Sequence, residues 1–280
     1  MSPVLLETIG PFLTATLYVA ATVALLRSFT SNSRSGRNIA LGITAVASVF
    51  HAVLQFQTWM NHPLDQITVV AALSLCSLAV VALWASTLAR PNPVFESGLF
   101  ALPIAAVANL LDGLVPGPPI DLGTGLGSAA PSTVIHVMSS ILAFGMLSLA
   151  GVYALLVLAV DHSLKRHELS KLIQNLPPLD RLEDLLFKLI ATGFALLTIA
   201  LVTGLLYVEN LMAQHLVHKT VLAFVAWFIF GSLLLGRWVK GWRGALAVRL
   251  TLAGIALLLL SYFGSKLVLE VILGRSWYSP

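Results

Sequence analysis

The chain alternates between long apolar segments and short stretches that hold most of its charged residues and prolines. A helix that crosses the hydrocarbon core of a bilayer needs about 20 mostly apolar residues. Eight such segments occur, at residues 10–26, 38–59, 66–88, 96–111, 132–160, 185–208, 217–238 and 245–273. They are apolar on all sides, which is typical of spanning helices rather than of amphipathic surface helices. We therefore predict an all-α fold: residues 1–280 form a single transmembrane domain, a polytopic helix bundle with about eight spans.

The composition strengthens this prediction and excludes other classes of protein. Hydrophobic residues make up 58% of the 280 residues, charged residues only 10%, and the mean hydropathy is +0.92. Soluble domains carry about 25% charged residues, so this chain cannot cover a globule of its size with polar side chains. An ordinary cytosolic enzyme and a disordered chain are therefore excluded. The single cysteine, Cys76, excludes a disulfide framework and a multi-cysteine metal site.

The start of the chain does not resemble a cleaved signal peptide. Glu7 precedes the first apolar segment, no basic residue does, and Arg27 follows it. We therefore expect this first segment to remain in the protein as a span.

The basic residues predict the orientation of the bundle. Of the 16 lysines and arginines, all but Lys219, Lys266 and Arg275 fall in loops on one side of the eight predicted spans. Basic flanks remain on the cytoplasmic side, so both termini are predicted on the outer, periplasmic side. The outer loops are then residues 60–65, 112–131 and 209–216. Because the basic residues are dispersed along membrane edges, we expect contact with membrane lipid and no nucleic-acid partner.

Two of the predicted loops have a distinct composition. Residues 161–184 form the cytoplasmic loop, and His162 to Asn175 within it has the pattern of an amphipathic surface helix. After the two prolines at 177–178, Asp180 with Glu183 three residues on resembles an N-cap and its partner at the start of the next helix. The outer loop at residues 112–131 is rich in glycine and proline and is predicted to be irregular, as a connector or a lid.

Ionisable residues inside a membrane are costly, so the histidines are the first candidates for a functional site. Five of the seven lie at or near the predicted outer face: His51, His62, His136, His215 and His218. A neutral imidazole is a good ligand for haem iron, and two histidines on different helices at one depth can hold the iron from both faces. His136 with His218, or with His215, meets the depth condition. His51 lies deeper, in the second span, and is a separate candidate for an intramembrane ligand.

Other assignments for these groups remain open. Glu209 with His215 and His218 could form a zinc site, although no His-Glu-x-x-His motif occurs. Lys219 follows His218 and either meets the carboxylate of a bound ligand, such as a haem propionate, or has no such role. Lys266 is expected to pair with Glu270 on the same helix face.

Several short stretches in the C-terminal half resemble a known family. They are residues 136–140 (HVMSS), 191–199 (ATGFALLTI), 218–220 (HKT), 226–230 (AWFIF), 241–244 (GWRG) and 261–264 (SYFG). In order and spacing this region, residues 132–273, is similar to the core of the integral-membrane cytochrome c assembly family, the CcsA, CcmC and CcmF group. It is most similar to the YpjD/HemX-like branch of that family.

The resemblance implies a function and assigns some of the site residues. The family handles haem at the outer face of the membrane for attachment to apocytochrome c. By resemblance, this protein binds b-type, non-covalent haem in the bacterial cytoplasmic (inner) membrane, with apocytochrome or other assembly components as partners. His136 matches an external histidine of the family, and such a protein is a haem chaperone rather than an enzyme.

The chain departs from its larger relatives at one loop. Those relatives carry a tryptophan-rich loop between two external histidines, whereas residues 215–220 keep Lys219 but contain no tryptophan and no Asp-Pro. The second external histidine would fall near Leu273. A non-haem accessory or regulatory subunit is therefore the main alternative. A small transporter is a weaker one, because the sequence shows no inverted repeat and no midplane charge pair.

Overall fold

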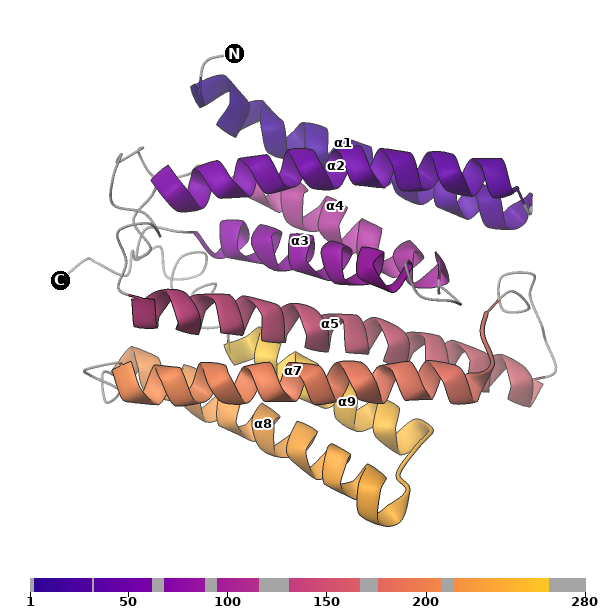
Figure 1. Ribbon diagram of the computed structural model, residues 1–280, viewed down its shortest axis with the longest axis vertical. Coiled ribbons are helices and arrows are strands. Elements are labelled where there is room, and N and C mark those ends of the chain that lie inside the picture. The colour runs from indigo at the N-terminus through magenta and orange to yellow at the C-terminus, as the bar shows by residue number, and fades with distance from the viewer. Residues whose placement is uncertain are drawn as a thin grey trace. The chain divides into compact units, whose positions relative to one another are not determined.

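The computed structural model describes residues 3–31, 33–61, 68–88, 95–115, 131–166, 176–207 and 214–261. Within these ranges all regular structure is helical, which confirms the predicted all-α class (Figure 1). The elements are α1 (Pro3–Thr30), α2 (Arg34–Asn61), α3 (Val69–Leu88), η1 (Phe95–Ser97), α4 (Gly98–Leu114), α5 (Pro131–Arg166), α7 (Leu179–Tyr207), α8 (Gln214–Lys240) and α9 (Ala245–Leu259).

The eight α-helices within the described residues correspond one for one to the eight apolar segments of the sequence. Six of the helical segments are long and apolar enough to cross a membrane: those of α1, α2, α4 with η1, α5, α7 and α8. The apolar parts of α3 and α9 that the structure describes are shorter, at Val70–Ser86 and Ala245–Leu259. The protein is therefore a multi-pass membrane protein. The last predicted span continues to residue 273, beyond the described residues.

The chain forms two compact units, and helix α5 contributes to both. Unit 1 comprises residues 1–130 and 159–182, and unit 2 comprises residues 131–158 and 183–280. Each unit has buried side chains of its own. Tyr18 and Trp84 are fully buried in unit 1, and Tyr153 and Phe230 are fully buried in unit 2.

In unit 1, helix α1 packs against α2 and α4, and α3 packs against α4 (Figure 1). Gly10 lets α1 approach the side chain of Leu54 on α2, where an added Cβ would lie 2.7 Å from a methyl carbon. At the other end of α2, the guanidinium carbon of Arg37 lies 4.4 Å from the centre of the Phe95 ring. These contacts position α1, α2 and α4 around a shared interior.

In unit 2, the helices meet at glycines. An added Cβ would lie 2.7 Å from Leu147 at Gly193, 2.6 Å from Ile255 at Gly151 and 2.7 Å from Phe230 at Gly254. Small residues of this kind let membrane helices approach closely and gain van der Waals contact. Unit 2 also contains a polar contact between helices: Trp227 on α8 donates its indole N–H to Thr198 Oγ1 on α7 at 2.8 Å.

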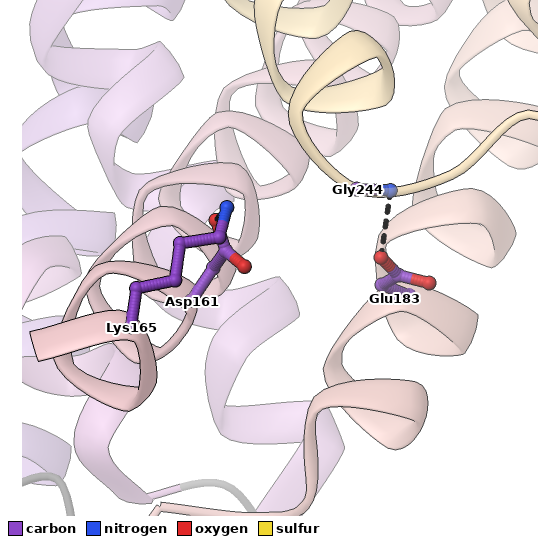
Figure 2. Close-up of polar contacts among 4 residues, drawn as sticks. All are labelled: Asp161, Lys165, Glu183 and Gly244. Carbon is purple, nitrogen blue, oxygen red and sulfur yellow. Dashed lines mark hydrogen bonds and ion pairs between the residues drawn. The ribbon is translucent and has the colours of Figure 1, made fainter. Parts of the chain in front are cut away.

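The structure corrects the prediction for the loop at residues 161–184. His162 does not begin a surface helix: α5 continues to Arg166, with Lys165 paired to Asp161 at 2.6 Å (Figure 2). Hydropathy marks where a helix is buried, and this helix extends past its apolar part because its last residues are good helix formers. Residues 167–175 lie outside the described ranges.

Two polar residues also differ from their predicted places. Helix α7 begins at Leu179, before Asp180, and the Glu183 carboxylate accepts the backbone N–H of Gly244 at 2.8 Å (Figure 2). The predicted Asp180–Glu183 capping pair is therefore wrong, because Glu183 has a distant partner. Asp112 lies in the last turn of α4 and not in the following loop.

Candidate functional site

His136 lies in the second turn of α5, and its ring is held by helix α7. Its Nδ1 is 2.9 Å from the carbonyl oxygen of Ala200 and 3.4 Å from Thr203 Oγ1. A carbonyl oxygen can only accept, so Nδ1 carries the proton and donates it. The neutral ring then has its lone pair on Nε2.

Gly204 makes this approach to α7 possible. A Cβ at residue 204 would lie 3.0 Å from Cε1 and 3.3 Å from Nδ1 of His136. Because residue 204 has no side chain, the His136 ring lies directly against the backbone of α7, one helical turn beyond Ala200. Sequence reasoning identified His136 but missed Ala200, Thr203 and Gly204. The only signal in the sequence was a glycine inside an apolar helix, and a glycine at such a position can have several other roles.

The second nitrogen of His136 is unpaired within the part of the chain that the structure describes. Among the described residues Nε2 has no hydrogen-bond partner, and the side chain is partly exposed. Histidines that ligate metals almost always donate their other ring N–H to a carbonyl or carboxylate, which fixes the tautomer and the ring orientation. His136 has this arrangement through Ala200.

His215 and His218 lie in the first two turns of α8, and their side chains are outside the described residues, as is that of Lys219. The start of α5, the end of α7 and the start of α8 lie at the same end of unit 2 (Figure 1). The contact between Trp227 and Thr198 sets the level of α8 against α7. His218 is nine residues from Trp227 along α8, or roughly 13 Å along the axis toward this end of the unit. The residues of α7 that contact His136 are centred roughly 6 Å from Thr198 in the same direction. His215 is three residues farther out, so His218 is nearer in level to His136.

His51 has a different environment, inside unit 1. Its side chain is 0% exposed, and both of its ring nitrogens have partners. Nε2 is 3.0 Å from Ser74 Oγ on α3, and Nδ1 is 3.2 Å from the Tyr18 hydroxyl on α1 and 3.4 Å from Asn109 Nδ2 on α4. If Nε2–H donates to Ser74, then Nδ1 accepts from the hydroxyl and the amide, and the neutral ring is fully satisfied.

The hydrogen bonds continue from His51 to the end of α4. Gln55 Nε2 donates to Ser74 Oγ at 2.9 Å and to Asp112 Oδ2 at 3.5 Å. Its Oε1 accepts the indole N–H of Trp59 at 3.2 Å. We call this set the unit 1 network: Tyr18, His51, Gln55, Trp59, Ser74, Asn109 and Asp112. The sequence pointed to His51 but not to its partners Tyr18, Ser74 and Asn109, which come from three other helices.

Other metal chemistry has little support in the described part of the chain. No group of three or more histidine, cysteine, aspartate or glutamate side chains lies close enough there to hold a metal ion. Cys76 is buried without a second cysteine. The possible zinc ligands His215, His218 and Glu209, together with the Lys266–Glu270 pair and His62, have side chains outside the described residues.

The fold and this site define a class: a multi-pass helical membrane protein that presents a histidine, in the tautomer suited to a metal, at one end of a helix bundle. The chain belongs to the cytochrome c assembly protein family, whose family model matches residues 9–273.

Individual relatives cover different shares of the chain. It is 38% identical over 144 residues to the inner membrane protein YpjD of Escherichia coli strain K12, which is 51% of this chain and 54% of that protein. An uncharacterised 28.8 kDa protein of Azospirillum brasilense is 30% identical over 242 residues, or 84% of this chain and 82% of the relative. The cytochrome c biogenesis protein CcsA of Cyanophora paradoxa is 30% identical over 100 residues, 35% of this chain and 31% of that one. The chain thus aligns with about half the length of YpjD, and no solved structure matches it significantly.

Proposed function

We propose that the protein binds b-type haem non-covalently, at the end of unit 2 where α5 begins, and handles it for cytochrome c assembly. The observation that carries this proposal is the hydrogen bond of His136 Nδ1 to the Ala200 carbonyl at 2.9 Å. It leaves the Nε2 lone pair available, and imidazole nitrogen is a common axial ligand of haem iron. Covalent attachment through two thioethers would need two cysteines, and the sequence has one.

His136 is the proposed first axial ligand, and His218 the proposed second. The level of His218 along α8 is nearer to His136 than that of His215, which supports this choice. His215 and the zinc assignment are the alternatives at this end of the unit. Lys219 would contribute a charge-assisted hydrogen bond to a haem propionate.

His51 is the less favoured of the proposed ligands. Both of its nitrogens are used inside unit 1, so ligation would break its hydrogen bonds to Tyr18, Ser74 or Asn109. A buried polar group that loses its partner costs about 1–3 kcal/mol. His136 incurs no such cost at Nε2.

Membership of the family and the names of the relatives support the wider role. CcsA is named a cytochrome c biogenesis protein and YpjD an inner membrane protein. We place this protein in the bacterial cytoplasmic membrane, with the haem site at the outer face that the basic residues predict. Its partners would be apocytochrome or other assembly components, and it would act as a haem carrier rather than as a catalyst.

The test is the absorption spectrum of the protein purified in detergent, before and after addition of haem. We expect a Soret band that is weakened and shifted in His136→Ala and in His218→Ala. Imidazole added to His136→Ala should restore it by replacing the missing ligand. His162→Ala is the matched control, because His162 lies on the same helix and is exposed.

The same spectra separate the alternatives. A colourless protein that also fails to take up added haem would contradict haem binding and favour a non-haem accessory subunit. A Soret band that survives His136→Ala but is lost in His51→Ala would move the haem site to unit 1.

A further inference from the structure

The turn between α8 and α9, residues 240–244, is held by backbone and side-chain contacts at one end of unit 2. Helix α8 ends at Lys240, and Gly241 follows with φ of 66°, in the left-handed region that glycine adopts without strain. Its N–H donates to the Arg237 carbonyl at 3.1 Å, as in a glycine-terminated helix. Gly244, with φ of 64°, then begins α9.

Three contacts hold this turn against the helices. Glu183 on α7 is 4% exposed, and its carboxylate accepts the Gly244 N–H at 2.8 Å (Figure 2). A negative group at the start of α9 is also favoured by the helix dipole. The Trp242 ring fills the space over Gly236, and the Arg237 guanidinium carbon lies 4.7 Å from the centre of the Phe187 ring.

The exposed side of the turn carries positive charge without matching carboxylates. Lys240, Arg243 and Arg249 are all exposed. The sequence has no aspartate or glutamate from residue 210 to residue 269. The two acids of α7 nearest the turn in unit 2 are already used: Glu183 binds Gly244, and Asp184 pairs with Lys188 at 2.7 Å. None of the three cations forms an ion pair with a described residue.

Large apolar side chains stand beside these cations. Trp238 is 77% exposed and Val239 is 71% exposed, and both directly precede Lys240. Tryptophan at the end of a membrane helix is typical of the boundary between headgroups and acyl chains. Clusters of basic residues at this boundary bind anionic lipid headgroups. The turn thus offers a cationic part for an anion and an apolar part for a hydrocarbon chain.

We infer that the α8–α9 turn is a binding site for an anionic phospholipid, with Arg243 and Lys240 contacting the phosphate and Trp238 and Val239 contacting an acyl chain. A phospholipid fits better than a free anion, because a free anion makes no use of the exposed apolar pair. The contacts of Gly244 and Trp242 hold the backbone of the turn, so the positions from which the cationic side chains extend are set before the lipid arrives, which favours binding. Arg249, on the second turn of α9, adds to the local positive potential.

The experiment measures lipid retention by the full chain in mild detergent, using native mass spectrometry with phosphatidylglycerol added. The double variant Lys240→Gln/Arg243→Gln should bind phosphatidylglycerol roughly thirty-fold more weakly, at about one kcal/mol per basic residue. The control Arg27→Gln/Arg34→Gln removes two exposed positive charges at helix ends in unit 1, and should bind like the unchanged protein. Arg243→Lys should also retain the lipid, since it keeps the charge.

Further arms distinguish the sources of the phosphate and the contribution of the apolar pair. Phosphatidylcholine, inorganic phosphate and glycerol 3-phosphate should each fail to compete with phosphatidylglycerol. Trp238→Ser/Val239→Ser should weaken retention while leaving all charges in place. The helical signal in circular dichroism checks that each variant is folded. If the double variant Lys240→Gln/Arg243→Gln does not fold, each single variant is measured in its place.

Two results would overturn the inference. One is equal retention of phosphatidylglycerol by the turn variant and the charge-matched control. The other is competition by inorganic phosphate as strong as by the lipid, which would indicate an adventitious anion site only.

Discussion

Two imidazoles, His136 and His51, show how one residue type is put to different uses within this chain. His136 donates Nδ1–H to a backbone carbonyl and keeps the Nε2 lone pair free. His51 uses both nitrogens inside a set of neutral polar partners. What separates the proposed ligand from the structural residue is which atoms lie within hydrogen-bonding distance of each ring, because both rings lie on apolar helices.

Gly204 gives a prediction about the orientation of His136. In Gly204→Ala the new methyl would lie 3.0 Å from Cε1, so the ring must move and its hydrogen bond to Ala200 weakens. Loss of such a supporting contact typically costs ten-fold or more in metal affinity, and we expect about that loss in haem affinity. Titration of the purified protein with haem, followed at the Soret band, measures it. Gly42→Ala is the control, since a Cβ at Gly42 meets nothing within 4 Å; equal loss in both variants would contradict the role of Gly204.

The unit 1 network gives the opposite expectation for His51. His51→Leu keeps a similar volume but leaves Tyr18, Ser74 and Asn109 without their shared partner. We expect the free energy of unfolding to fall by about 1–3 kcal/mol, with haem binding at His136 unchanged. Thermal unfolding in detergent measures the first effect and the Soret band the second. If His51→Leu unfolds normally but binds no haem, the assignment of His51 as a structural residue is wrong.

At the scale of helices, the described part of unit 2 is held together where glycines face large side chains. Gly193, Gly151 and Gly254 each receive a leucine, isoleucine or phenylalanine side chain from a neighbouring helix. In lipid, where apolar surface gains nothing by leaving water, close van der Waals contact of this kind drives helix association.

The same substitution at two glycines should therefore have opposite effects. Gly254→Ala places a Cβ 2.7 Å from the Phe230 ring, and overpacking of this sort costs about 1–3 kcal/mol. Gly42→Ala fills open space within α2 and should stabilise by about 0.4–1 kcal/mol, because alanine loses less backbone entropy. Unfolding temperatures of the two variants in one detergent test this pair. A stabilised Gly254→Ala would show that α8 and α9 do not pack as described.

The helices themselves could be predicted from the sequence, whereas several of their ends and contacts could not. Each apolar segment became a helix, because length and hydropathy determine what can cross a bilayer. Asp112 was misplaced because a polar residue in the last turn of a helix looks like the start of a loop. Glu183 was misassigned because the capping pattern is local, while its partner Gly244 is 61 residues away.

The candidate site was predictable to a similar degree. His136 stood out as a costly polar residue near a membrane edge, and the family resemblance pointed to the same position. Ala200 and Gly204 could not be identified, because a backbone carbonyl and a missing side chain leave no mark on a polarity pattern. The same holds for Ser74 and Asn109, which become partners of His51 only when three helices meet.

At the scale of the whole molecule, the basic residues follow one rule in each unit. In unit 1, Arg27 lies in the last turn of α1, while Arg34 and Arg37 lie in the first turn of α2. In unit 2, Arg237 and Lys240 lie in the last turn of α8. From the positive-inside rule we expect these ends on the cytoplasmic side, and the haem site proposed at the start of α5 on the outer side.

Cysteine labelling tests this orientation. Cys76 is 4% exposed, so the natural chain should react little with a membrane-impermeant maleimide. In spheroplasts we expect labelling of Leu114→Cys, at the end of α4, but not of Ser31→Cys, next to the basic end of α1. Both should react once the membrane is permeabilised. The reverse pattern would place the start of the chain in the cytoplasm and contradict an outer haem site.

The hydrogen bonds around His51 have a mechanical consequence for unit 1. They join α1, α2, α3 and α4 at one depth, where hydrocarbon supplies no water to replace a lost partner. Sliding or rotating any one of these helices would strand polar groups on the others. We therefore expect the four helices to keep their mutual register and to move together in any conformational change of unit 1.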